Sequence, residues 1–181
     1  MTAMPSQPPP WGSSLPSPLA IQPRYARLFF MDAKSFLERY WDWNIPVDVF
    51  AMAQAAGAEL VPDQDLGASG QLSFDGDKPV IRYSFLEHPV RQRFTVAHEL
   101  GHLMLRHGPA FRDSPDNFNV SVWDPKEVEA NRFAADILMP KDAIEYLIRQ
   151  KKVYSPHDMA AALNVSPIAM QFRLKNLGWL R

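Results

Sequence analysis

The chain has 181 residues, of which 46% are hydrophobic and 22% are charged, and this globular composition excludes a largely disordered chain or a fibre. Lys and Arg together number 19 and Asp and Glu 20, so the net charge of -1 gives the whole molecule no attraction to nucleic acid or to an anionic membrane. Cysteine is absent, which excludes disulfides, thiol catalysis and cysteine-bound zinc. Any bound metal must therefore be held by histidines and carboxylates.

Residues 1–23 form a Pro- and Ser-rich tail that holds seven of the 17 prolines. Because proline fixes φ and removes a hydrogen-bond donor, we expect this tail to be extended, either as a linker or as a strap across the substrate groove. It lacks the basic start and unbroken apolar stretch of a secretory signal, and the chain has no apolar run long enough to span a membrane. We expect a cytoplasmic protein with one domain over residues 24–181.

The remaining sequence predicts helices, then a small group of strands, then more helices, which together indicate a mostly helical α+β fold with a small antiparallel sheet. Asp75-Gly76 lies between two alternating apolar runs and signals a hairpin, whose edge could accept an extended substrate as an added strand. The residues 109–124 are expected to form a surface loop. Helices are expected over 24–43, 46–56, 89–106, 125–139, 140–150, 155–164 and 166–177, and strands over 59–61, 71–74 and 80–83.

The expected helix over 89–106 contains the motif His98-Glu99-Leu100-Gly101-His102. Residues four apart share a helix face, so both imidazoles can bind one zinc ion, and the Glu99 carboxylate can take a proton from water at that ion. Such a motif arises by chance roughly 0.005 times in a chain of this composition. Burying His98, Glu99 and His102 without a use would also be costly, which favours a metal site over ordinary packed or surface histidines.

A third metal ligand must come from elsewhere in the chain. His107 does not fit the extended spacing His-Glu-x-x-His-x-x-Gly-x-x-His, because Gly108 stands where the third histidine would be, so His107 is expected to be a helix-terminal cation or a packing residue. The next helix offers Glu127 and Glu129, which face different ways, so only one can meet the metal. Helical periodicity favours Glu129, while Glu127 has the position of a solvated first-turn acid.

Other residues are candidates for supporting roles. Asn131 and Asp136 are expected to orient the imidazoles through their second ring nitrogens, with a plain surface charge as the alternative for Asp136. Peptide hydrolysis also needs a donor that stabilises the oxyanion. The candidates for that donor are Tyr83, Arg93, His107, Tyr154 and His157.

Two segments, Arg93–His102 and Glu127–Pro140, resemble the ImmA/IrrE family of zinc metallopeptidases. The second segment, which ends in Leu-Met-Pro, is nearly as telling as the first. The resemblance extends over about residues 46–180 and implies a zincin-like (thermolysin-like) core in which two histidines and a glutamate bind zinc. On this chain the resemblance assigns the ligands to His98, His102 and Glu129, the glutamate before Ala-Asn, with Glu99 as the general base.

The C-terminal subregion 153–181 has the pattern of a helix-turn-helix. Its second helix offers only Gln171, Arg173 and Lys175 as polar contacts, so we favour a structural or substrate-recognition role over DNA binding.

The expected function is that of a zinc-dependent endopeptidase, whose site could also take Mn²⁺ or Fe²⁺. The resemblance implies a protein substrate, typically a helix-turn-helix (Xre-type) transcriptional repressor cleaved under stress or during mobile-element induction. Two alternatives stay open. One is a toxin bound and neutralised by an Xre-type antitoxin, and the other is a DNA-binding regulator with a structural zinc site.

Overall fold

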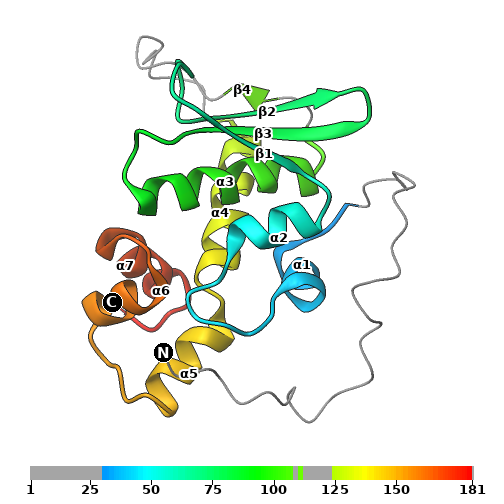
Figure 1. Ribbon diagram of the computed structural model, residues 1–181. Helices are drawn as coiled ribbons and strands as arrows, with labels where there is room; N and C mark the ends of the chain where they lie inside the picture. Colours follow the sequence, from blue (N-terminus) through cyan, green and yellow to red (C-terminus); the bar gives the residue numbers. More distant parts are fainter. Residues whose placement is uncertain (1–29, 108–109, 112–123, 181) are drawn as a thin grey trace.

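The computed structural model describes residues 30–107, 110–111 and 124–180, so the tail, residues 24–29 and most of the expected loop lie outside the described residues. The described residues form an α+β fold, as predicted (Figure 1). The helices are α1 (Ala33–Tyr40), α2 (Val49–Ala55), α3 (Pro89–Met104), α4 (Pro125–Leu138), α5 (Lys141–Arg149), α6 (Pro156–Leu163) and α7 (Pro167–Asn176). The strands are β1 (Glu59–Asp63), β2 (Gly70–Asp75), β3 (Lys78–Ser84) and β4 (Ala110–Phe111).

The sheet is mixed, which corrects the expectation of an antiparallel one. Its strand order is β1-β3-β2-β4, with β2 antiparallel to β3 and β1 parallel to β3. The expected hairpin is present, with Asp75 opposite Lys78 and Gly76 at a positive φ of 58°. The chain direction reverses between β1 and β2 and again in the hairpin. Because β1 pairs with β3 rather than with its sequence neighbour β2, those two reversals make the pair parallel.

Strand β4 was not expected from the sequence. It pairs antiparallel with β2, placing Phe111 opposite Gln71 and Ala110 opposite Leu72. The outer edge of the hairpin, which we expected to be open to an extended substrate, is thus occupied by β4 at these two positions.

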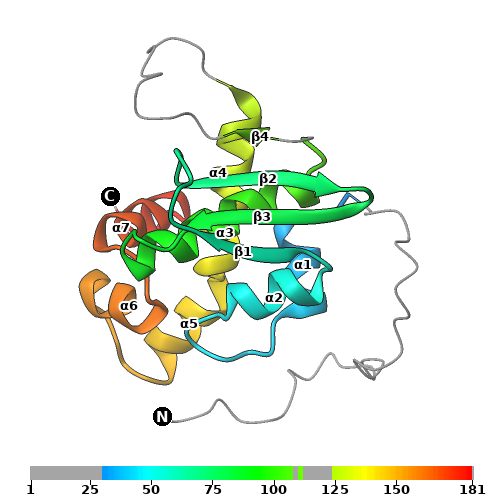
Figure 2. The same ribbon diagram turned by 45° about the horizontal axis from the view of Figure 1, so that its top comes forward.

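One face of the sheet packs against α3, and the other helices lie on that same side (Figures 1 and 2). Helix α3 lies between the sheet and α4 and is therefore buried along much of its length. Apolar side chains from both layers form one core, which includes Phe36, Leu72, Ile81, Leu100, Phe133, Ile137 and Ile144. The motif His98-Glu99-Leu100-Gly101-His102 thus lies on a helix that is largely buried.

Several helices begin with a capping residue followed by proline, which has the φ angle of a helix and lacks the unpaired N–H. Asp124 caps α4, where its carboxylate accepts from the Lys126 N–H at 2.8 Å, and Pro125 follows. Ser155 and Ser166 play the same part for α6 and α7. Helix α2 instead begins at Val49, after its cap Asp48, and not at Pro46 as expected.

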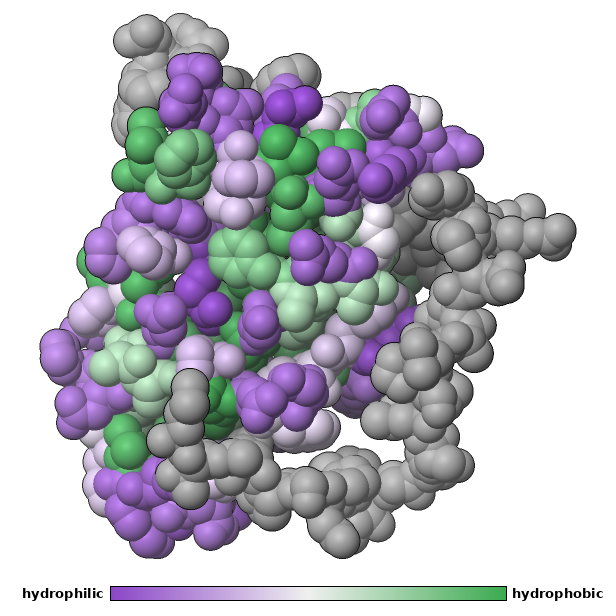
Figure 3. All heavy atoms as spheres, viewed as in Figure 1, coloured by the Kyte–Doolittle hydropathy of each residue, from purple (hydrophilic) through white to green (hydrophobic). Residues whose placement is uncertain are grey.

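Apolar and polar residues are interleaved over the face seen in Figure 3. Within the residues that the structure describes, no helix combines the length and the apolar character needed to cross a membrane.

Candidate metal centre

Helix α3 carries the three residues of the motif on its buried side. His98 and Glu99 are fully buried, and His102 is 2% exposed. The spacing of four residues places the two imidazoles on one face of the helix, where their Nε2 atoms lie 3.0 Å apart. Two imidazole nitrogens therefore converge on one point.

Helix α4 supplies the carboxylate that completes this cluster, and it is Glu127. Its Oε2 lies 3.2 Å from His98 Nε2 and its Oε1 lies 3.1 Å from His102 Nε2. One ligand atom from each of the three residues lies within 4.8 Å of the others, an arrangement that could hold a metal ion. This corrects the expectation of Glu129, whose carboxylate contacts His107 instead.

A second residue of α4 meets the opposite nitrogen of His98. The Asn131 Oδ1 atom lies 3.0 Å from His98 Nδ1. Because an amide oxygen can only accept, this contact suits the His98 tautomer that has its hydrogen on Nδ1 and its lone pair on Nε2, the atom that faces Glu127. This is the contact expected of Asn131 as an orienting partner.

The profile of one protein family, described as the IrrE N-terminal-like domain, matches residues 52–175, a span that contains α3, α4 and the whole cluster. The chain belongs to this peptidase family. A search of curated proteins found no match to the chain.

The donor set of this IrrE N-terminal-like domain fits a divalent metal. Two neutral imidazoles and one carboxylate, His98, His102 and Glu127, are ligands typical of catalytic zinc sites, which keep a further position open. The fully buried Glu99 follows the first ligand in the same helix. The family match and the cluster together support a metallopeptidase.

The other histidine near the cluster, His107, belongs to its surroundings. Its Nδ1 lies 3.1 Å from His102 Nδ1, and its Nε2 lies 3.0 Å from Glu129 Oε2. The expectation of His107 as a terminal cation or packing residue did not include this connection. Glu129, which was expected to be a metal ligand, contacts His107 and not the two imidazoles of the cluster.

Two glycines let backbones approach the motif closely. A Cβ on Gly101 would lie 3.1 Å from both Cα and O of Ala130, so the absence of a side chain allows α3 and α4 to meet there. A Cβ on Gly70, the first residue of β2, would lie 2.9 Å from Glu99 Oε1 and 2.4 Å from Thr95 Cγ2. The start of β2 therefore lies directly against the Glu99 carboxylate.

The remaining predicted residues make their contacts elsewhere. The carboxylate of Asp136 accepts from the Arg173 guanidinium, which joins α4 to α7, so the structure does not place it as an orienting partner of an imidazole.

Three of the candidate oxyanion donors lie in other surroundings. Tyr83 lies opposite Gly70 in the sheet, but its ring packs edge-on against that of Phe50, with the ring centroids 5.5 Å apart. Tyr154 is 66% exposed between α5 and α6. His157 contacts Asp158 at 3.5 Å on the surface of α6.

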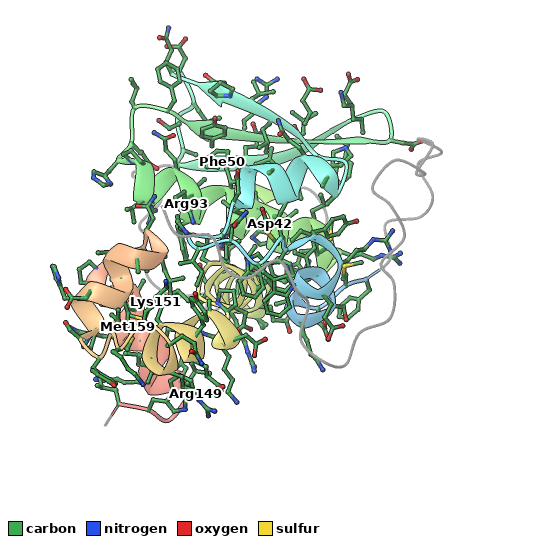
Figure 4. The ribbon with its side chains drawn as sticks, turned by 60° about the horizontal axis from the view of Figure 1, so that its bottom comes forward. Asp42, Phe50, Arg93, Arg149, Lys151 and Met159 are labelled. Carbon is green, nitrogen blue, oxygen red and sulfur yellow. The ribbon has the colours of Figure 1, made fainter. Side chains whose placement is uncertain are left out.

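Arg93, another candidate donor, has a structural position. Its guanidinium donates to the carbonyls of Val47 at 2.8 Å and Asn164 at 3.3 Å, where α3 approaches α2 and the C-terminal helices (Figure 4). Burial lowers the pKa of the Arg93 guanidinium, and the charge of Asp48 acts in the opposite direction.

Proposed function

We propose that this chain is a zinc-dependent endopeptidase in which His98, His102 and Glu127 hold the zinc ion and Glu99 is the general base. The convergence of two imidazole nitrogens and a carboxylate beside the buried Glu99 carries this proposal. Zinc is favoured because two histidines and one glutamate suit it, while Mn²⁺ or Fe²⁺ could occupy the same ligands.

In this proposal the zinc ion, Glu99 and Asn131 have separate roles in peptide hydrolysis. A bound zinc ion supplies Lewis-acid activation of a water molecule and of the scissile carbonyl. Glu99 accepts a proton from the attacking water and returns it to the leaving amine. Asn131 keeps the His98 ring in one orientation, and the backbone at Gly70 limits where the Glu99 carboxylate can lie.

The substrate class follows from the family resemblance. It points to an intracellular protein of the helix-turn-helix repressor (Xre) type, cleaved in the cytoplasm in a stress response or during mobile-element regulation. The alternative of a toxin held by an Xre-type antitoxin uses the same site and the same class of partner. It differs in that the partner survives contact with the enzyme.

Direct DNA binding through α6 and α7 is a weaker alternative. Arg173, one of only three polar residues that the second helix of this segment offers as contacts, donates to the Asp136 carboxylate and to the Met139 carbonyl. Ile168 and Phe172 on the same helix are 63% and 60% exposed, which gives α7 a partly apolar outer surface. Such a surface suits a protein partner better than a phosphate backbone.

The test uses Zn²⁺-loaded protein and the helix-turn-helix proteins encoded beside its gene or elsewhere in the same genome. Intact-mass spectrometry should find one of them cut at a defined bond. Glu99→Gln should keep zinc and slow the cut by about 10²- to 10⁴-fold, because glutamine cannot accept the proton. The exposed Glu38→Gln is the matched control. Cleavage by Glu99→Gln at the parental rate would contradict the proposal.

A structural zinc site makes a different prediction for the ligands. If zinc only held the fold together, His98→Ala would lose zinc and unfold. We expect His98→Ala to lose zinc and cleavage while its far-UV circular dichroism stays that of the folded parent.

A further inference from the structure

A chain of side chains connects the metal cluster to the protein surface. His102 belongs to the cluster, His107 contacts its Nδ1 atom, and Glu129 contacts the far side of the His107 ring, at 3.1 Å and 3.0 Å respectively. Exposure rises along this chain, because the side chains of His102, His107 and Glu129 are 2%, 7% and 61% exposed. A buried ligand is thus linked to a solvated carboxylate through one intermediate ring.

For neutral imidazole rings, the chemistry of the three groups allows one consistent placement of the hydrogens. A carboxylate only accepts, so the His107 Nε2–H donates to Glu129. The neutral His107 ring then has its lone pair on Nδ1, where it accepts from His102 Nδ1–H. This leaves the lone pair of His102 on Nε2, the atom that faces Glu127. The arrangement selects the tautomer that a metal ligand needs.

The backbone at the end of α3 brings His107 back to the cluster. In a continued helix a residue five positions on would be rotated away from His102. Here Arg106 adopts a positive φ of 58°, the His107 N–H donates to the His102 carbonyl at 3.0 Å, and the Arg106 N–H donates to the Leu103 carbonyl at 3.3 Å. These two bonds define a Schellman turn, which folds residue 107 over the last turn of α3.

Helix α4 holds residue 107 at two points. The Lys126 ammonium donates to the His107 carbonyl at 3.4 Å, and Glu129, three residues further along α4, accepts from the ring. Residues three apart lie on one helix face, so α4 fixes both the backbone and the ring of His107. The same helix presents Glu127 to the metal position.

We propose that His107 and Glu129 are positioning residues for His102, which fix its ring orientation and tautomer and so strengthen metal binding. The inference rests on the proposed function only in that it takes the cluster to bind a metal ion. It concerns affinity rather than cleavage, so it can be measured without a substrate.

The test compares Zn²⁺ affinity between two replacements of the same ring. His107→Phe keeps the ring volume but has no acceptor for His102 Nδ1–H, and we expect about 10- to 100-fold weaker binding by competition with a chelator. His107→Asn places an amide oxygen near the lost Nδ1, as Asn131 does for His98, and should restore part of that affinity, because it still lacks the contact with Glu129. The Co²⁺-loaded protein should show an altered visible absorption spectrum for His107→Phe only.

The outer residue gives a second, independent variant. Glu129→Ala should weaken Zn²⁺ binding by about 10-fold, the lower end of the range for outer-shell changes. The control is Asp142→Ala on α5, which also removes one negative charge but at a position outside the cluster. It should leave the Zn²⁺ affinity unchanged. The melting temperature of each metal-free variant shows whether it folds. If His107→Phe does not fold, Glu129→Ala decides.

Unchanged Zn²⁺ affinity in folded His107→Phe or in Glu129→Ala would overturn the positioning role while leaving the proposed function intact. Equal losses in His107→Phe and His107→Asn would overturn the assigned acceptor role. A parent protein that binds neither Zn²⁺ nor Co²⁺ would overturn the proposed function and this inference together.

Discussion

Glu127 and Asn131 lie one helical turn apart on α4 and meet opposite nitrogens of the same ring, that of His98. The Glu127 Oε2 atom is 3.2 Å from Nε2, and the Asn131 Oδ1 atom is 3.0 Å from Nδ1. Because residues four apart share a helix face, α4 presents both the candidate ligand Glu127 and the residue Asn131, which orients the ring of His98. The position of α4 against α3 therefore determines the geometry of the centre.

The choice between the two glutamates of α4 is testable by metal binding. Glu127→Ala removes a carboxylate that faces both imidazoles, and Zn²⁺ affinity should fall by more than the roughly 100-fold upper limit for outer-shell changes. Glu129→Ala should lose less, because its carboxylate reaches the centre only through His107. Titration with a competing chelator measures both. The two variants change the net charge equally, and a larger loss in Glu129→Ala would reinstate the glutamate favoured by periodicity.

A second prediction concerns the close approach of α3 and α4. Gly101→Ala would place a Cβ 3.1 Å from backbone atoms of Ala130, which cannot yield unless α4 moves. Overpacking should cost about 1–3 kcal/mol, against about 1 kcal/mol gained from the better helix propensity of alanine. Zn²⁺ affinity should fall as well, because Glu127 moves with α4. Urea unfolding and metal titration measure the two effects.

Gly67→Ala is the matched control for this change, because its Cβ would meet nothing within 4 Å. If Gly101→Ala bound Zn²⁺ as tightly as Gly67→Ala, the helix contact would not be what places Glu127.

The sequence predicts the part of the centre that depends on local geometry. His98, Glu99 and His102 lie within one helical segment, so their spacing alone places them together. The glutamate on α4 is different, because its choice depends on how that helix is rotated against α3. Asn131 was expected to face an imidazole, and Glu127 is four residues before it, so the spacing between these two residues was the available signal.

Other features depend on contacts that no local pattern specifies. His107 returns to the cluster because Arg106 adopts the left-handed conformation that usually belongs to glycine, while the nearby Gly108 suggested a later helix end. The parallel pairing of β1 with β3 and the short strand β4 arise from long-range pairing. The close approach of Gly70 to Glu99 likewise joins a strand to a helix.

A third prediction separates structure from catalysis at Arg93. Arg93→Met removes a buried guanidinium that donates to the carbonyls of Val47 and Asn164, and it should lower the free energy of unfolding by about 2–3 kcal/mol. Arg91→Met, two residues earlier and more exposed, should stay within about 0.5 kcal/mol of the parent. Urea denaturation measures both. Full stability with lost cleavage in Arg93→Met would instead make Arg93 the oxyanion donor.

The last prediction separates the general base from the metal. Gly70→Ala would place a Cβ 2.4 Å from Thr95 Cγ2 and 2.9 Å from Glu99 Oε1, and both of these are side-chain atoms that can move. We expect Glu99 to be displaced, which should lower kcat by about 100-fold, while Zn²⁺ affinity stays near that of Gly67→Ala. Adding Thr95→Ser removes the methyl group that causes the shorter contact and should recover part of the lost rate. Equal activity in Gly70→Ala and Gly67→Ala would show that the start of β2 does not constrain Glu99, because the overlap would then have been relieved without moving the base.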